Sequence, residues 1–282
     1  MADISLATTL ILVSAFFHAC WNAILKSGED RDALIGILNV VAAGFAIPLI
    51  WLVPFPSTAD WVWIAVSVTV HLGYQLSLAR MMGSADYSLV YPISRGLGPL
   101  IVTMVSLFIL ATPLSGVEVL AILILISGAM LAGFASAGRL HAPPMSALLW
   151  AGLVGILIGT YTVIDGSAVK RMEPLTFILW SNILIMPPMM ALLYRNHGKN
   201  FTERMQKNWK RGLVMTIVAY GGYTMALYAF SLGNLAEIAA LRETSIFFAA
   251  IIGAYVLREQ ITPLRLFGIS MIAVGAILLK SF

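Results

Sequence analysis

The sequence predicts an all-α membrane protein whose ten transmembrane helices form two five-helix inverted repeats. Three observations support this: long apolar blocks, a count of ten such blocks, and a likeness between the two halves of the chain. Of the 282 residues, 60% are hydrophobic and 11% are charged, against about 25% charged in an ordinary soluble domain. So little charge cannot cover a soluble surface of this size, and we therefore expect the chain to lie in a lipid bilayer.

Each apolar block is long enough for a helix that crosses a membrane, which requires about 20 mostly apolar residues. The blocks do not alternate apolar and polar residues as the strands of a membrane β-barrel do. Helices are therefore the expected spanning elements, because only helices and closed barrels satisfy every backbone hydrogen bond in lipid. The predicted spans are Ile4–Leu25, Ala33–Val53, Trp61–Met82, Leu89–Leu110, Ser115–Ala135, Ala147–Val169, Leu175–Tyr194, Leu213–Leu232, Ile238–Leu257 and Pro263–Lys280.

An internal repeat relates the two halves. The segment Ile126–Leu131 resembles Ala273–Leu278, and the same offset places Arg95 on Arg242. Since each half has an odd number of spans, homologous halves must enter the membrane with opposite orientations. The connections are short except around 195–211, so no separate soluble domain is expected. We expect a first five-helix repeat at 1–137 and a second at 146–282, within one integrated membrane domain.

Basic residues gather on one side of the predicted topology, whereas the other side carries only Lys170, Arg171 and Lys280. Because basic loops stay in the cytoplasm, we expect both termini outside. The first apolar block is too long for a signal peptide and has no basic region before it, and the compact length favours a bacterial inner (plasma) membrane. The basic side carries Lys26, Arg31, Arg80, Arg139, Arg195, Lys199, Arg204, Lys207, Lys210, Arg211, Arg258 and Arg265.

Several function classes find no support in the sequence. Cys20 is the one cysteine and cannot form an internal disulfide, and no Cys or His spacing predicts a metal site. The net charge of +4 indicates loop charge near lipid head groups rather than nucleic-acid binding. No nucleophile–base or carboxylate pair suggests an intramembrane enzyme. We expect no enzyme activity, no cofactor and no metal, and partners limited to lipid and a small molecule. An internally duplicated chain can act as a monomer.

Polar side chains within the predicted spans are the candidates for a binding site, because in lipid they face the bundle interior or a water-filled cavity. Residues three or four apart share a helix face. Arginine binds carboxylates through a planar fork, and aromatic rings stack on flat ligands or hold cations. The third, fourth, eighth and ninth spans are expected to enclose the cavity. The predicted substrate-binding residues are His71, Tyr74, Gln75, Tyr91, Arg95, Trp21, Asn22, Tyr161 and Tyr223.

Four further polar residues have two interpretations each, as coupling groups or as packing and ion-pair residues. Asp165 can couple transport to a proton or another cation, or it can form a salt bridge. Arg242 can pair with its neighbour Glu243 or reach an interface, and His18 can bond a neighbouring carbonyl. The salt-bridge partners considered for Asp165 are Arg95, Lys170 and Arg171.

The terminal span carries the motif that resembles a known family. Leu266–Ile269 and Gly275–Leu278 lie within it, and Leu257–Thr262 precedes it. Together with the ten-span pattern, these segments resemble EamA-type transporters of the drug/metabolite transporter superfamily. The first half departs from this turn at Leu110–Ser115. The resemblance implies a transporter, and the aromatic-rich polar faces are most similar to the YddG-type exporters of aromatic amino acids.

The resemblance and the polar faces together predict a secondary carrier or facilitator. It is expected to export small metabolites, amino acids and in particular aromatic ones, by alternating access around a central cavity. The alternative is a proton-coupled exporter of lipophilic cationic drugs, which requires an essential intramembrane carboxylate. Small multidrug members of the superfamily have a Glu in their first helix, and Ile4–Leu25 has no acidic residue.

Overall fold

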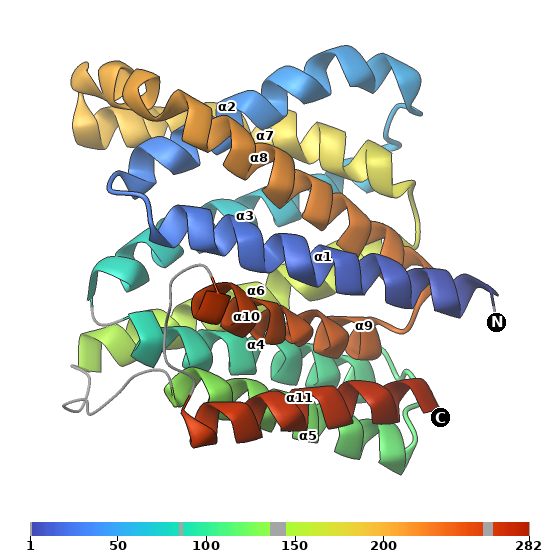
Figure 1. Ribbon diagram of the computed structural model, residues 1–282. Helices are drawn as coiled ribbons and strands as arrows, with labels where there is room; N and C mark the ends of the chain where they lie inside the picture. Colours follow the sequence, from blue (N-terminus) through green and yellow to red (C-terminus); the bar gives the residue numbers. More distant parts are fainter. Residues whose placement is uncertain (1, 85–86, 136–144, 256–261, 282) are drawn as a thin grey trace.

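The computed structural model describes residues 2–84, 87–135, 145–255 and 262–281, which are helical apart from short connections (Figure 1). Long apolar stretches form the helices, as expected where every backbone group must bond within its own segment. The helices are α1 (Ala2–Lys26), α2 (Arg31–Leu49), α3 (Thr58–Ser84), α4 (Tyr87–Phe108), α5 (Gly116–Phe134), α6 (Met145–Ala168), α7 (Pro174–His197), α8 (Asn200–Leu232), α9 (Leu235–Leu241), α10 (Ser245–Tyr255) and α11 (Pro263–Ser281), with 3-10 turns η1 (Ile50–Leu52) and η2 (Arg242–Thr244).

Local chemistry fixes several helix ends. The carboxylate of Asp30 accepts a hydrogen bond from the first turn of α2 at 3.0 Å, and the amide of Asn234 does the same for α9 at 3.0 Å. These caps satisfy backbone donors that have no partner inside the helix. Gly198 ends α7 with a φ of 65°, a conformation that glycine adopts without steric cost.

Two details differ from the sequence-based prediction. The ninth span is not the continuous helix Ile238–Leu257: it begins at Leu235 and is divided by η2 into α9 and α10. The segment 195–211, expected as a loop, is the end of α7 and the start of α8. Within it, Lys207 and Glu203 form an ion pair at 2.9 Å one helical turn apart, a spacing that supports an exposed helix.

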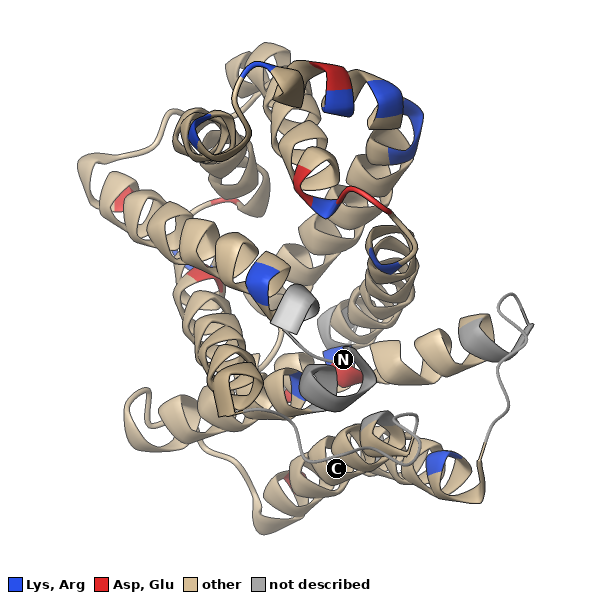
Figure 2. Ribbon diagram, turned by 90° about the vertical axis from the view of Figure 1, so that its left-hand side faces the viewer, with Lys and Arg blue, Asp and Glu red and all other residues tan. Residues whose placement is uncertain are grey.

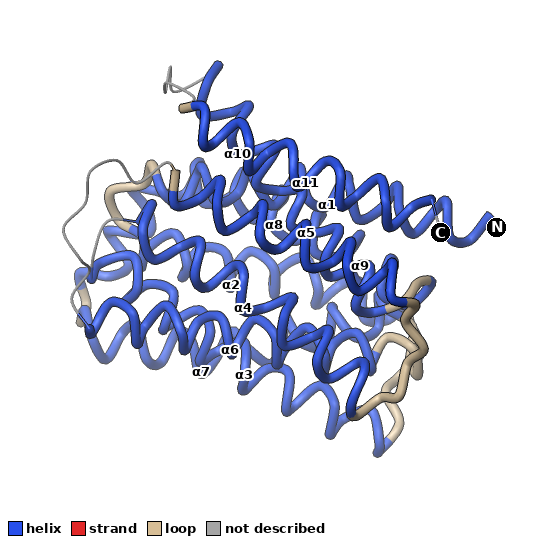
Figure 3. Tube along the Cα trace, turned by 90° about the horizontal axis from the view of Figure 1, so that it is seen from below, coloured by secondary structure: helices blue, strands red, loops and turns tan. Residues whose placement is uncertain are grey.

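The helices have the dimensions of membrane spans. Among the described residues, six helices of at least 18 residues are apolar enough to cross a bilayer, and three shorter apolar helices accompany them within α4, α5 and α11. The view from below shows the connections gathered at two opposite ends, with both termini at the same end (Figure 3). This arrangement agrees with the predicted all-α membrane fold.

Helix packing has a two-fold pattern. Helix α1 packs on α8, and α6 packs on α3; α4 packs on α6, and the α9–α10 region packs on α1. The pairs α2–α7 and α5–α11 each join equivalent helices of the two halves. Exchanging the halves therefore maps one set of contacts onto the other. Helices α5 and α11 run in opposite directions (Figure 1), as an inverted repeat requires. The repeat boundaries 1–137 and 146–282 remain a prediction.

Candidate functional site

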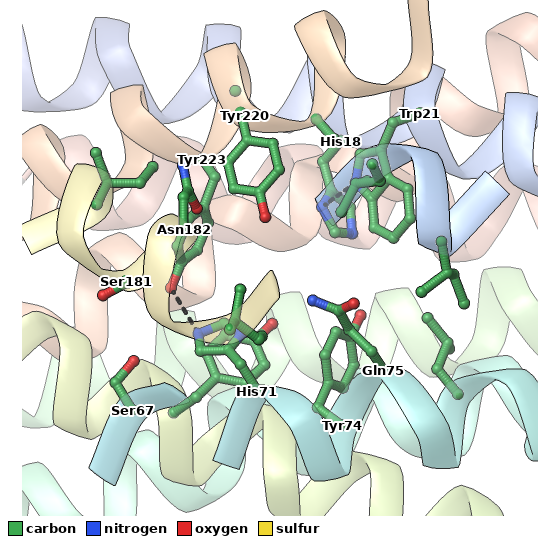
Figure 4. Close-up of a pocket in the computed structure, with 18 of the residues that line it drawn as sticks. His18, Trp21, Ser67, His71, Tyr74, Gln75, Ser181, Asn182, Tyr220 and Tyr223 are labelled. Atoms are coloured by element: carbon green, nitrogen blue, oxygen red, sulfur yellow. Dashed lines mark hydrogen bonds between the residues drawn. The ribbon is translucent and has the colours of Figure 1, made fainter. Parts of the chain in front are cut away.

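A cavity lies between helices of the two halves (Figure 4). Its walls come from α1, α2 and α3, from their counterparts α6, α7 and α8, and from η2. It contains about 120 Å³ that the centres of water molecules can occupy, enough for several waters. The polar and aromatic lining residues are Ser14, His18, Trp21, Ser67, His71, Tyr74, Gln75, Tyr161, Phe177, Ser181, Asn182, Tyr220, Tyr223 and Arg242.

Aromatic rings cover one wall. The rings of His71 and Tyr161 stack with centroids 4.3 Å apart, and Tyr74 meets Tyr161 edge-on at 5.2 Å. Tyr223 completes the group, 5.7 Å from His71. Rings that hold one another in this way lose little freedom when a flat ligand stacks on them. The wall draws on α3 of the first half and on α6 and α8 of the second.

Beside this wall, Asp165 is fully buried. Its Oδ2 lies 2.7 Å from His71 Nε2 and accepts a hydrogen bond from the hydroxyl of Tyr223. Its Oδ1 has no hydrogen-bond partner among the described residues. Among the described residues, the printed contacts of Asp165 are therefore with His71 and Tyr223, and not with the basic residues considered from the sequence.

A second buried charge cluster joins α4 to η2 and α10. Arg95 forms an ion pair with Glu243 at 3.0 Å, with both side chains 3% exposed. Its guanidinium also donates to Ser245 Oγ at 2.9 Å and lies 3.0 Å from His18 Nε2. Arg95 is thus held by protein groups and does not line the cavity.

Arg242, the sequence counterpart of Arg95, lies on the cavity side. It lines the cavity and is 7% exposed. Its guanidinium lies 5.6 Å from the ring centroid of Tyr223 and 3.5 Å from His18 Nδ1, while its Nε has no hydrogen-bond partner among the described residues. The ion pair considered between Arg242 and Glu243 is not the one that the structure describes, since Glu243 pairs with Arg95.

The structure brings six of the predicted binding residues to the cavity and leaves two away from it. Asn22 is buried but donates to the carbonyl oxygen of His18 in its own helix, at 2.8 Å. Arg95 is in the ion pair, and the side chain of Tyr91 lies outside the described residues. No described side chain of α4 lines the cavity, whereas η2 in the ninth span contributes Arg242, so the expectation that the fourth span encloses the cavity stays a prediction. The six lining residues are His71, Tyr74, Gln75, Trp21, Tyr161 and Tyr223.

Some lining residues were missed from the sequence. Ser67 lies one helical turn before His71 and two before Gln75, so the spacing of α3 could have indicated it. Ser181 and Asn182 of α7 carry no comparable signal, since no other polar residue shares their face. The hydroxyls of Ser67 and Ser181 have no partner among the described residues. Such buried polar groups are available to water or to a ligand.

A network of charged side chains lies at the end of the molecule where α1 is connected to α2. Arg204 of α8 binds both carboxylate oxygens of Asp30 at 2.6 Å and lies 2.7 Å from His197, which contacts Asp32 at 2.7 Å. The hydrogen bonds from Arg204 hold the pKa of the Asp30 carboxyl below its usual value. Figure 2 looks onto this end, where acidic and basic residues gather on neighbouring helix ends. The network joins the α1–α2 connection to α7 and α8.

Comparison with known proteins identifies the fold and finds a family model that matches the second half of the chain. Residues 145–281 match the model of the EamA-like transporter family. Among 29 solved chains that match, one described as "Crystal structure of protein" superposes with a TM-score of 0.78 at 13% identity, over 99% of this chain and 98% of that chain. At this identity the likeness concerns the fold alone. No curated protein matches the chain.

Proposed function

Because residues 145–281 of this chain match the model of the EamA-like transporter family, we propose that the protein is a secondary carrier or facilitator that exports amino acids. A membrane transporter of small molecules is what the family implies; the substrate class is our inference from the cavity. Aromatic amino acids are favoured, because a carboxylate-binding cation and an aromatic wall border the same space.

The surplus buried charge of Arg242 is the observation that carries this proposal. Among the described residues, the cluster at η2 contains the guanidinium groups of Arg95 and Arg242 but only the carboxylate of Glu243, which pairs with Arg95. An uncompensated cation inside a bilayer is costly, and a ligand carboxylate would compensate it. The planar fork of arginine suits a carboxylate better than a point charge would, and the Nε of Arg242 has no hydrogen-bond partner among the described residues.

Alternating access suits the position of the cavity. Transporters built from inverted repeats bind substrate near the bilayer midplane between the repeats and rock around that site. The network of Asp30 and Arg204 joins helices at one end, and would have to open for substrate to pass on that side. We place this basic end in the cytoplasm and both termini outside, by the distribution of Lys and Arg, with the inner membrane of a bacterium as the setting.

A proton-coupled exporter of lipophilic cationic drugs remains the second candidate. One observation favours it: Asp165 is a buried intramembrane carboxylate next to an aromatic wall, and such groups attract cations. This candidate gives Arg242 no role in binding. Replacement of Arg242 therefore separates the two candidates.

Uptake into proteoliposomes tests the proposal. We expect saturable uptake of radiolabelled phenylalanine and tryptophan, and weaker uptake of threonine. Arg242→Ala should lower kcat/KM for phenylalanine by roughly 10- to 150-fold, the value of a hydrogen bond to a charged group, and Arg242→Lys should lower it less. Arg195→Ala, which removes an exposed cation outside the cavity, is the matched control. Transport of tetraphenylphosphonium but of no amino acid, unchanged in Arg242→Ala, would favour the second candidate.

A further inference from the structure

We propose that the cavity binds a zwitterion at two fixed charges, with the ligand carboxylate on Arg242 and the ligand ammonium on the Asp165–His71 pair, where it replaces a proton. The exporter would then exchange one proton for each amino acid. This inference rests on the proposed function for the carboxylate, and adds the second charge and the coupling ion.

The contacts of Asp165 leave it one vacant oxygen. Oδ2 is occupied by the hydroxyl of Tyr223 and by the imidazole of His71, and Oδ1 has no partner among the described residues. The side chain of His71 is 18% exposed and lines the cavity. A ligand reaching His71 therefore lies next to the carboxylate behind it.

A proton on His71 and a ligand ammonium can each compensate the negative charge of Asp165, so one can replace the other. Asp165 is 0% exposed, and a buried carboxylate without a cation is costly. The ion-pair partner that the described residues supply is His71, which is a cation only when it binds a proton. A ligand ammonium brings the same charge. When it binds, the imidazolium of His71 gives its proton to water, which carries it out of the cavity. The positive charge beside Asp165 is thereby replaced, and the ligand carboxylate balances Arg242.

The two protein charges proposed to bind the ligand, on Arg242 and Asp165, both contact Tyr223. The guanidinium of Arg242 lies over the face of Tyr223, and the hydroxyl of the same ring donates to Asp165. In an α-amino acid, the ammonium and carboxylate groups are both bonded to the same carbon atom, so they lie close together. The fixed cation thus lies over the face of Tyr223 and the fixed anion at its hydroxyl, so a zwitterion bound to both would leave its side chain to the aromatic wall.

Other charged and titratable groups nearby are already engaged or neutral. His18 of α1 lies beside Trp21 at 3.1 Å and beside Arg95 at 3.0 Å. The ion pair of Arg95 and Glu243 compensates itself. Among the described lining residues, the other titratable groups from α3, α6 and α8 are the phenols Tyr74, Tyr161 and Tyr220.

The proton balance fits export. On one side of the membrane, an amino acid binds and the His71–Asp165 pair releases a proton. On the other side, the amino acid leaves and the pair takes up a proton from that side. Amino acid and proton therefore move in opposite directions, and an inward proton gradient drives the amino acid outward.

Binding of three related probes to the purified protein tests this inference. L-phenylalanine has both charges, 3-phenylpropanoate lacks the ammonium, and phenethylamine lacks the carboxylate. In weakly buffered solution, we expect phenylalanine to release about one proton per molecule bound, and its affinity to rise about tenfold per pH unit where the site is proton-loaded. 3-Phenylpropanoate should bind without releasing a proton, and phenethylamine should bind at least tenfold more weakly than phenylalanine.

Variants separate the ammonium site from the folding of the protein. Asp165→Asn should abolish proton release and the pH dependence of phenylalanine binding, Asp165→Glu should retain both, and Glu203→Gln, an exposed carboxylate, should change neither. Unchanged binding of 3-phenylpropanoate by Asp165→Asn shows that this variant is folded. Phenylalanine binding without proton release in the unaltered protein overturns the inference and leaves the proposed function intact. Failure of both carboxylate probes to bind overturns the two together, and phenethylamine binding as tightly as phenylalanine overturns the two-charge site.

Discussion

The carboxylate of Glu243 pairs with the guanidinium of Arg95 at 3.0 Å, although Arg242 is its neighbour in the sequence. The pair joins α4 of the first half to η2 of the second, so it ties the two halves together as well as neutralising Arg95. Because Glu243 pairs with Arg95, Arg242 has no carboxylate from this pair and lines the cavity instead. The two arginines, equivalent in the internal repeat, thus have different environments.

Arg95→Ala should therefore destabilise the protein rather than weaken substrate binding alone. The change leaves Glu243 as an unpaired buried carboxylate, which costs about 3–5 kcal/mol in buried ion pairs. We expect a lower unfolding temperature in detergent, measured by intrinsic fluorescence. The double variant Arg95→Ala/Glu243→Ala removes both charges and should recover part of the loss. Equal stability of the single variant and the unaltered protein would contradict a paired role for Arg95.

These two residues show what the sequence could predict and where it stopped. Arg95 and Arg242 are identifiable because charges inside apolar blocks are rare, and their common offset reveals the repeat. Which of them pairs with Glu243 depends on how α4 packs against η2. The spacing of residues within one helix cannot predict such a contact between distant segments. For this reason the sequence placed both in a candidate site but assigned the cavity cation to Arg95.

The fold was easier to predict from the sequence than the site, because the length of each hydrophobic block predicts one span independently of the others. The break in the ninth span had local signals: the cap residue Asn234 and the polar run Arg242–Thr244. The helical continuation of α8 before Leu213 had one as well, in the ion pair of Glu203 and Lys207. A membrane-span count ignores such signals, because it averages hydrophobicity over a whole block and does not score caps or short polar runs.

Tyr161 should contribute to aromatic substrates through its ring and not through its hydroxyl. Its ring stacks on His71 at 4.3 Å and meets Tyr74 at 5.2 Å. Tyr161→Phe retains these contacts and should leave phenylalanine affinity within about twofold. Tyr161→Ala removes the ring and should weaken it by roughly 2- to 12-fold, the equivalent of about 0.5–1.5 kcal/mol for an aromatic pair. Calorimetric Kd values for both variants provide the measurement, and equal losses in both would assign the effect to the hydroxyl.

The Asp30–Arg204 pair should make stability depend on pH at the acidic end of the range. Arg204 lowers the pKa of Asp30 in the folded protein below its usual value of 3.8. The stabilisation is therefore fully present above that value and is lost as the pH falls through the lowered pKa. Asp30→Asn should unfold at a lower temperature than the unaltered protein at pH 6, and the difference should shrink towards pH 3. Glu203→Gln serves as the control at the same end, and a difference that grows on acidification would contradict the pairing.

Small residues between α5 and α11 should be essential for packing the two halves at their outer edge. A Cβ added at Gly128 would lie 2.7 Å from the backbone oxygen of Gly268, and one added at Gly268 would lie 2.5 Å from the backbone nitrogen of Ala132. Backbone atoms cannot move aside as a flexible side chain can, so the helices must separate. Gly268→Ala should destabilise the protein by about 1–3 kcal/mol, the usual cost of overpacking a core.

Gly152 offers the matched control for this change, because a Cβ added there meets no atom within 4 Å. Gly152→Ala should leave the unfolding temperature unchanged or raise it, since alanine favours a helix by about 1 kcal/mol over glycine. The unfolding temperatures of the two variants should be measured in the same detergent, so that the solvent affects both values equally. If Gly268→Ala were as stable as Gly152→Ala, the close approach of α5 and α11 would not be needed to hold the two halves together.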